Sequence, residues 1–202
     1  MRSFSDRRNK TMGNRTNTKE RLAESFKKLA KRQPIEKMTI REITDDAGVL
    51  RSTFYRHFQD KYQLLEHIYR SEVLGPAAPL IQNEMLTEAV ILIFIRMLQD
   101  REFYGKVYRL EGQNSFESIV TACLKQTMLE FIQTHSENRI SRHELMSPEM
   151  LAEYYSKLWT AFILSWMEDG MKTSPQEMGE IFEYLTSRSL TQILQEMEIR
   201  VE

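Results

Sequence analysis

A short segment that begins at Thr39 constrains the fold of this chain more than any other. Thr39 is followed three residues later by Glu42, the spacing of a reciprocal capping box that starts a helix. Gly48 supplies the backbone freedom that a tight turn between two helices needs. Phe54 and Phe58 are four residues apart, which suits the buried side of a second short helix. The segment therefore predicts a helix-turn-helix.

The second helix of this motif is expected over about residues 51–58. Its outward side chains can all donate hydrogen bonds and none is acidic, which suits contact with phosphates and base edges: they are Arg51, Ser52, Thr53, Tyr55, Arg56 and His57. Asp60 and Gln63 repeat the capping-box spacing, so a further helix is expected from Lys61 to about Leu74. Lys61 and the free backbone amides beside it could hold a phosphate.

Residue groups at fixed spacings strengthen this interpretation: Gly48-Val49, Thr53-Phe54-Tyr55, His57-Phe58, Asp60-Lys61 and Leu64-Leu65. With them, about residues 18–70 resemble the tetracycline-repressor-type (TetR) bacterial transcriptional regulators. Leu50 departs from the family pattern, which often has a polar helix cap there, and Arg56 replaces a frequent aromatic residue. The resemblance implies an all-α dimeric regulator, most often a repressor, that binds a near-palindromic double-stranded DNA operator.

The resemblance also implies roles for residues at matching positions. The candidates for base contacts are Arg41, Arg51, Ser52 and Thr53. The candidates for phosphate contacts, which fix register without reading sequence, are Thr39, Tyr55, His57 and Lys61. For His57 the alternative is a solvated surface histidine. No metal site is expected, because His67 lies ten residues on and faces another side.

The charge of the chain is divided between its two parts. Residues 1–70 hold 17 Lys and Arg against 9 Asp and Glu, whereas residues 71–202 hold 11 against 20. A basic N-terminal part is typical of a nucleic-acid binder, and an acidic remainder discourages further contact with DNA. Residues 1–17 are basic and lack hydrophobic periodicity, so they predict a flexible arm that reaches a minor groove or a solvated tail.

Other classes of protein find little support in the sequence. The longest apolar run, 89–95, is far shorter than the roughly 20 residues that span a bilayer, and no targeting segment is apparent. The single Cys123 excludes an internal disulfide and a Cys-based zinc site. His143-Glu144 lacks a second histidine, and neither a nucleophile elbow nor a phosphate-binding glycine loop occurs. A cytoplasmic protein without enzymatic activity or cofactor is expected.

Periodicity predicts about nine helices in all. A first helix is expected over 18–31, and a break at Gly75, Pro76 and Pro79 separates an N-terminal domain (18–74) from a C-terminal one (80–202). The other predicted helices cover 85–100, which is apolar nearly all round and should be buried, then 115–134, 148–169 and from Ser174 to about Met197. A strand over 90–95 is the alternative there, and residues 133–146 are expected to be a loop.

The last two predicted helices carry more apolar surface than one core stripe would use. In the resembled family this hairpin forms a four-helix dimer interface, and two recognition helices on two half-sites multiply the affinity. The candidate interface residues are Phe162, Trp166, Ile181, Phe182 and Leu185. The alternative is that all of them belong to the core of one subunit.

The resemblance also implies that residues 80–202 receive a signal, with the helix that begins at Lys61 as the transmitting element. Candidate ligand-pocket residues are Arg96, Tyr104, Arg109, Tyr155 and Trp159. For the first three the favoured alternative is an ordinary salt bridge or surface group. The usual signal in the family is a small apolar molecule. The alternative is a protein co-activator, because the segment from Trp159 through Ser174-Pro175 resembles a subgroup that regulates dihydroxyacetone kinase genes. An apolar cavity of several hundred Å³ would favour the small ligand.

Overall fold

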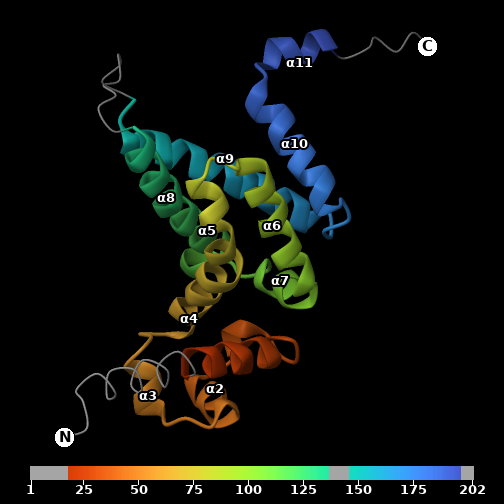
Figure 1. Cartoon of the computed structure of the whole chain (residues 1–202). Helices are drawn as coiled ribbons and strands as arrows, with labels where there is room; N and C mark the ends of the chain where they lie inside the picture. The colour runs from red at the N-terminus through yellow and green to blue at the C-terminus, as the bar shows by residue number, and fades with distance from the viewer. Residues whose placement is uncertain (1–17, 137–145, 197–202) are drawn as a thin grey trace, which may run out of the picture.

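The computed structural model describes residues 18–136 and 146–196, and within them it contains helices and no strands. Figure 1 shows a small head of short helices beneath a larger helical body. We use "head" for residues 18–60 and "body" for residues 75–196. The predicted N-terminal arm, residues 1–17, lies outside the described residues. No helix in the described ranges is long and apolar enough to cross a membrane.

The head contains a helix over 18–30, the 3₁₀ turn η1 (Ile35–Lys37), α2 (Ile40–Ala47) and α3 (Arg51–Tyr55). The predicted capping box is confirmed, since the Thr39 hydroxyl accepts from the Glu42 N–H and the Glu42 carboxylate accepts from the Thr39 N–H. Gly48 ends α2 in the left-handed region, with φ of 62°. The helix-turn-helix is thus present, and its inner side chains Leu22, Phe26, Ile43, Phe54 and Phe58 are buried.

The second helix of the helix-turn-helix, α3, is shorter than the sequence predicts. It ends at Tyr55, and Phe58 is buried from the turn that follows. The N-cap residue of α3 is Leu50, whose side chain cannot cap the helix. The five residues of α3 are therefore stabilised by few hydrogen bonds of their own. α3 is therefore held by packing, chiefly through Phe54, which contacts Phe58 at 5.7 Å between ring centroids.

The expected break after Leu74 is wrong, because the backbone stays helical from residue 61 to residue 82. α4 (Lys61–Ile68) passes into a π-helical stretch, η2 (Tyr69–Leu74), and then into α5 (Gly75–Gln82). The Gly75 N–H donates to the Arg70 carbonyl five residues back, which is the hydrogen bond of a π-helical turn. This wider turn lets the backbone continue as a helix into the segment that contains Gly75 and Pro76. Pro76 then falls in the first turn of α5, directly after the π-helical stretch. The predicted division into domains stays a prediction.

The body is built around α6 (Leu86–Gln99), as its apolar sequence predicts, and the strand alternative is excluded. Ala89, Ile93, Phe94 and Met97 of α6 are buried. The helices that follow are α7 (Arg101–Val107), the 3₁₀ turn η3 (Gly112–Asn114), α8 (Phe116–His135), α9 (Pro148–Glu168), α10 (Pro175–Ser187) and α11 (Leu190–Glu196). α8 packs along α9, while α10 packs against α6 (Figure 1).

Several boundaries in the body differ from the predicted ones. α7 was not predicted, and α8 runs to His135, so residues 133–135 are helical and 137–145 lie outside the described residues. The predicted helix start at Ser174 is confirmed, with Ser174 and Glu177 forming a capping box, but the last predicted helix is divided in two. The backbone is extended at Arg188, and Ser189 then caps α11 through a reciprocal pair with Gln192. The extended residue Arg188 thus ends α10, and a third capping box begins α11.

α10 and α6 meet at Gly179, where a side chain would not fit. A Cβ atom built there would clash with Cγ1 of Ile91. Overpacking of this kind costs about 1–3 kcal/mol, so Gly179→Ala should lower the free energy of unfolding in urea by about that amount.

Gly105 provides the matched control, because it lies in α7 with no atom within 4 Å of its virtual Cβ. Gly105→Ala should stabilise the protein by roughly 0.5–1 kcal/mol through helix propensity. Equal unfolding midpoints for the two variants would show that the α6–α10 contact is looser than described.

Candidate functional site

The exposed surface of α3 is cationic and its side chains are partly ordered by one another. Arg51 donates from Nη2 to the Tyr55 hydroxyl at 3.1 Å and its guanidinium lies 5.5 Å from the centroid of that ring. Arg56 donates from Nη2 to Thr53 Oγ1 at 3.2 Å. Arg51, Ser52, Tyr55 and Arg56 are exposed, whereas Thr53 is half-buried. The structure thus brings three of the four base-contact candidates together on one short helix.

Arg41, the fourth candidate, lies on α2 with a side chain that is 84% exposed. Its Nε lies 3.5 Å from the Asp45 carboxylate one turn on, an exposed pair that is worth under about 1 kcal/mol. Such a pair holds the guanidinium only weakly. Arg41 can therefore exchange Asp45 for a base edge at little cost.

The phosphate candidates have unequal freedom. Thr39 donates from both its hydroxyl and its backbone N–H to the Glu42 carboxylate, so both of its donors serve the capping box. The backbone amides of Tyr62 and Gln63, expected to be free at the start of α4, donate to Asp60 Oδ1. Tyr55 is exposed and His57 is half-buried beside Phe58.

Lys61 is engaged inside the head. Its Nζ donates to the carbonyl oxygens of Glu36 at 2.7 Å and Met38 at 2.9 Å, at the end of η1. Burial at this place lowers the pKa of Lys61, and the nearby carboxylates of Glu36 and Asp60 oppose that effect. The side chain ties α4 to the turn before α2. The phosphate contacts predicted for Thr39 and Lys61 stay predictions.

The turn of the helix-turn-helix has a support that the sequence analysis missed. Arg21, on the helix over 18–30, donates from Nη2 to the carbonyl oxygens of Ala47 and Gly48. These carbonyls end α2 and lack partners within it, so a cation there is favourable. Only the helical register of Arg21 relative to buried Leu22 could have suggested this contact.

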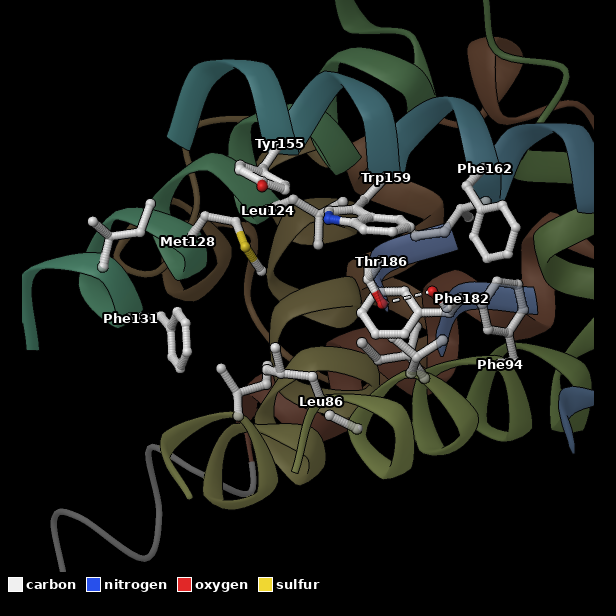
Figure 2. Close-up of a pocket in the computed structure, with 16 residues that line it drawn as sticks. Leu86, Phe94, Leu124, Met128, Phe131, Tyr155, Trp159, Phe162, Phe182 and Thr186 are labelled. Atoms are coloured by element: carbon white, nitrogen blue, oxygen red, sulfur yellow. Dashed lines mark hydrogen bonds between the residues drawn. The ribbon is translucent and has the colours of Figure 1, made fainter. Parts of the chain in front are cut away.

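A cavity of about 260 Å³ lies in the body between α5, α6, α8, α9 and α10, and it is open to solvent beside Tyr155, which is 45% exposed. Figure 2 shows Tyr155, Trp159 and Phe162 of α9 projecting toward Leu86 and Phe94 of α6 and Phe182 of α10. The lining is mostly apolar and also includes Ile81, Ala89, Val90, Ile93, Leu124, Met128, Phe131, Ile132, Ile163 and Thr186. Two of the predicted pocket residues, Tyr155 and Trp159, thus lie at a cavity.

The polar groups of this lining are few and none carries a formal charge. They are the Tyr155 hydroxyl, the Trp159 indole N–H and the Thr186 hydroxyl, which already donates to the Phe182 carbonyl at 2.8 Å. An ion placed inside would therefore lose its hydration without a compensating charge, which costs several kcal/mol. The cavity suits an uncharged, mostly hydrocarbon molecule.

The other three predicted pocket residues lie elsewhere. Arg96 and Arg109 are exposed on the surface and do not line the cavity. Tyr104 is 2% exposed, packed against Phe103 and Phe116 in the core. The sequence gives the helical face of these residues but not the neighbour that covers it.

The predicted interface residues divide into two groups. Trp166 and Phe182 are buried within the subunit, where the Trp166 indole donates to the Thr173 carbonyl, and Phe162 lines the cavity. These three serve the interior of one chain. Ile181 and Leu185 are exposed on α10, and Tyr154 and Leu158 form an exposed apolar pair on α9.

The contacts of Lys61 predict a loss of stability when its charge is removed. Lys61→Met leaves two carbonyls without a charged donor, which should lower the free energy of unfolding by about 1–2 kcal/mol. Lys37→Met, at an exposed position of η1, should change it little and serves as the control. If Lys61 acted chiefly on phosphates, Lys61→Met would leave stability unchanged and lower the salt slope of DNA binding by about 0.9.

Comparisons with known proteins agree with this architecture. Residues 27–68 match the family model described as bacterial regulatory proteins, tetR family, and residues 84–188 match the model of a transcriptional regulator C-terminal region. No curated protein matches the sequence significantly.

Three solved structures illustrate the likeness in fold. The dihydroxyacetone kinase operon activator DhaS is 20% identical with a TM-score of 0.56, covering 88% of this chain and 97% of its own. FadR of Thermus thermophilus, a repressor in complex with lauroyl-CoA, is 17% identical with a TM-score of 0.57, covering 91% and 97%. NalD of Pseudomonas aeruginosa, a repressor of a multidrug efflux pump, is 15% identical with a TM-score of 0.53, covering 85% and 94%.

At these identities the structural likeness concerns the fold alone. The family models add the assignment, because the two matches cover both the helix-turn-helix and the body, and the second alone covers more than half of the chain. The chain therefore belongs to the TetR family of bacterial transcriptional regulators.

Proposed function

We propose that this regulator binds a near-palindromic operator as a homodimer, as a repressor, and that a small uncharged apolar molecule in the cavity controls this binding. The observation that carries the proposal is the charge-free cavity in the body of a chain whose head holds a cationic helix-turn-helix. DNA recognition and signal reception are thus assigned to separate parts of one chain.

The DNA contacts follow from the donors that the head leaves exposed. Arg51 and Ser52 on α3, with Thr53 beside them, are proposed to read base edges, and Arg41 is proposed to do so from α2. The Tyr55 hydroxyl accepts from Arg51, which leaves its own hydrogen for a phosphate oxygen. His57 is proposed to hold a second phosphate.

The proposed dimer uses the apolar side chains that the subunit leaves uncovered. Tyr154 and Leu158 are 59% and 56% exposed on α9, and Ile181 and Leu185 are 41% and 48% exposed on α10. Each pair is spaced four residues apart, so each forms a stripe on one helical face. Two copies can bury these stripes against each other around a two-fold axis.

The chemistry of the cavity selects the class of signal. A cationic drug would find no carboxylate in the lining, and an anionic headgroup would find no lysine or arginine there. A neutral molecule of hydrocarbon character avoids both costs. The presence of a cavity also favours a small ligand over a protein co-activator, because a protein would bind the surface of the body and would not occupy a cavity. The co-activator alternative keeps the resemblance of the segment from Trp159 through Ser174-Pro175 and gains the likeness in fold to the activator DhaS.

Selection of bound DNA fragments by the purified protein tests the DNA half of the proposal. The selected site should be an inverted repeat with half-sites about one helical turn apart, as a symmetric dimer requires. Arg41→Ala should relax preference at one base pair of each half-site, a loss of about 1–3 kcal/mol in discrimination. Lys106→Ala, on the exposed surface of α7, should leave both affinity and preference unchanged. Equal losses on selected and random DNA for Arg41→Ala would reject the base contact.

Two fluorescent probes that share one skeleton test the cavity. N-phenyl-1-naphthylamine is neutral, whereas 8-anilino-1-naphthalenesulfonate adds a sulfonate that the lining cannot pair. The neutral probe should bind at least about tenfold more tightly, a difference of about 1.4 kcal/mol.

Ala89→Leu should weaken binding of the neutral probe by about tenfold or more, because it fills the cavity from α6. Ala122→Leu, the same exchange on the exposed face of α8, is the control and should leave binding unchanged. Tighter binding of the sulfonate, or equal effects of the two leucine variants, would contradict the proposed ligand class.

A further inference from the structure

The head touches the body at a second place besides the continuous helical segment 61–82. The helix over 18–30 lies against the junction of α6 and α7, where Phe26 meets Phe103 edge to face with ring centroids 6.1 Å apart. Beside it, Lys27 of the same helix and Lys31 just after its end both reach the carboxylate of Asp100 in the body. The angle of the head is therefore fixed at two points.

Lys27 is at the centre of these contacts. Its Nζ donates to Glu72 Oε2 of η2 at 2.6 Å and to Asp100 Oδ2 at 2.9 Å. Lys31 Nζ lies 3.5 Å from the other oxygen of Asp100. The Lys27 side chain is 19% exposed and that of Asp100 is 27% exposed, so water screens this group less than a surface pair. We call these four residues, Lys27, Lys31, Glu72 and Asp100, the junction cluster.

Asp100 occupies a position where its usual role is different. It is the N-cap residue of α7, where an aspartate normally accepts from the backbone amides of the first turn. Its side chain makes no such bond, and both carboxylate oxygens face lysines of the head instead. The first turn of α7 is left without a side-chain cap in favour of a contact between head and body.

The charges within the cluster favour the paired state. Burial by itself would lower the pKa of Lys27, but the hydrogen bonds to Glu72 and Asp100 outweigh it and raise that pKa above its ordinary value. Burial would raise the pKa of Asp100, and the bond from Lys27 together with the charges of Lys27 and Lys31 lowers it instead. Lys27 and Asp100 therefore stay ionised near neutral pH.

One rigid element joins the junction cluster to the cavity. α6 lines the cavity with Leu86, Ala89, Val90, Ile93 and Phe94, and its C-cap residue is Asp100. A helix of 14 residues is about 21 Å long, so a shift imposed at the cavity is carried to its end without bending. A displacement of 1–2 Å, typical of helix shifts in switching proteins, is enough to lengthen a hydrogen bond of 2.9 Å beyond bonding range.

We infer that the junction cluster is a coupling device, in which Asp100 transmits the position of α6 to Lys27 and so sets the angle of the DNA-binding head. The inference rests on the proposed function, because it takes the cavity to be the site of the signal. The signal then has two routes from the body to the head, one through the helical segment that begins at Lys61 and one through the junction cluster. Lys27 joins the two routes, since its other partner, Glu72, belongs to the segment 61–82.

The test compares Lys27→Met and Asp100→Asn with a matched control on the same helix. Lys28 also pairs with a carboxylate, Asp46 at 2.5 Å, but that partner lies within the head. Lys28→Met therefore removes an ion pair of the same kind without touching the body. Lys27→Arg keeps the charge and should restore the behaviour of the wild type.

The readout is the distance between head and body, which needs no DNA. Nitroxide labels are placed at two exposed positions, Lys37→Cys in the head and Glu117→Cys at the start of α8, and measured by pulsed electron paramagnetic resonance. Dilution with unlabelled protein restricts the measurement to pairs within one chain. The native Cys123 is buried and its burial raises the pKa of the thiol to about 12, so it does not take up the label.

N-phenyl-1-naphthylamine should shift the distance between the labels by about 2 Å in the wild type, in Lys28→Met and in Lys27→Arg. The shift should fall below about half of that in Lys27→Met and Asp100→Asn, with a broader distribution, although the probe still binds. Ala89→Leu fills the cavity without any probe. Introduced into each of these variants, it should shift the distance between the labels in the same variants as the probe does.

Three results would overturn the inference. The first is a full shift of the label distance in Lys27→Met, and the second is an equally reduced shift in Lys28→Met. The third is that neither adding the probe to the wild type nor introducing Ala89→Leu alone shifts the distance. Operator binding measured in parallel separates this inference from the proposed function. If the probe releases the operator from Lys27→Met as readily as from the wild type, the cavity controls DNA binding and the junction cluster does not.

Discussion

A helix that is apolar on nearly every side has to be covered on every side, and α6 imposes this requirement on the whole body. α10 covers one face so closely that Gly179 has no room for a side chain. Phe162 and Trp166 of α9 cover another, with ring centroids 5.8 Å and 4.7 Å from Phe94. Where these two helices and α8 leave the N-terminal part of α6 incompletely covered, the cavity remains.

The electrostatics of the chain follow the same division. Charges gather in the head and on the surface of the body, and the interior around α6 has none along the cavity. A neutral signal can therefore act only through shape, by occupying volume that moves a helix. At the end of α6 the mechanical signal meets charges again, because Asp100 pairs with two lysines of the head. A neutral ligand bound near the N-terminal end of α6 is thus placed to alter the ion pairs of Asp100 at the C-terminal end.

Local signals in the sequence predicted the starts of helices well. The capping boxes at Thr39 and Ser174 and the cap at Ser147 begin helices, since each joins a side chain to groups only three residues along the chain. The same kind of signal at Ser189 was overlooked because the apolar pattern continues through it.

Predictions failed where a distant part of the chain decides the outcome. Gly75 and Pro76 look like a break, but the π-helical turn before them and the packing of α5 on α6 keep the segment helical. Tyr104 looks like a pocket residue until Phe103 and Phe116 cover it. Lys61 looks like a free cation until η1 brings two carbonyls to it. None of these partners can be read from the residues near each position.

α10 gives the proposed dimer a direct connection with the cavity. Phe182 and Thr186 on one face of this helix line the cavity, while Ile181 and Leu185 on the adjacent face are exposed and belong to the proposed interface. Neighbouring residues on one rigid helix cannot move independently. A ligand that displaces α10 would therefore shift the interface stripe by a similar distance, while its effect on α6 reaches the head through Asp100. The separation of the two heads and the angle of each head would then change together, which is the geometry that an operator with two half-sites senses most strongly.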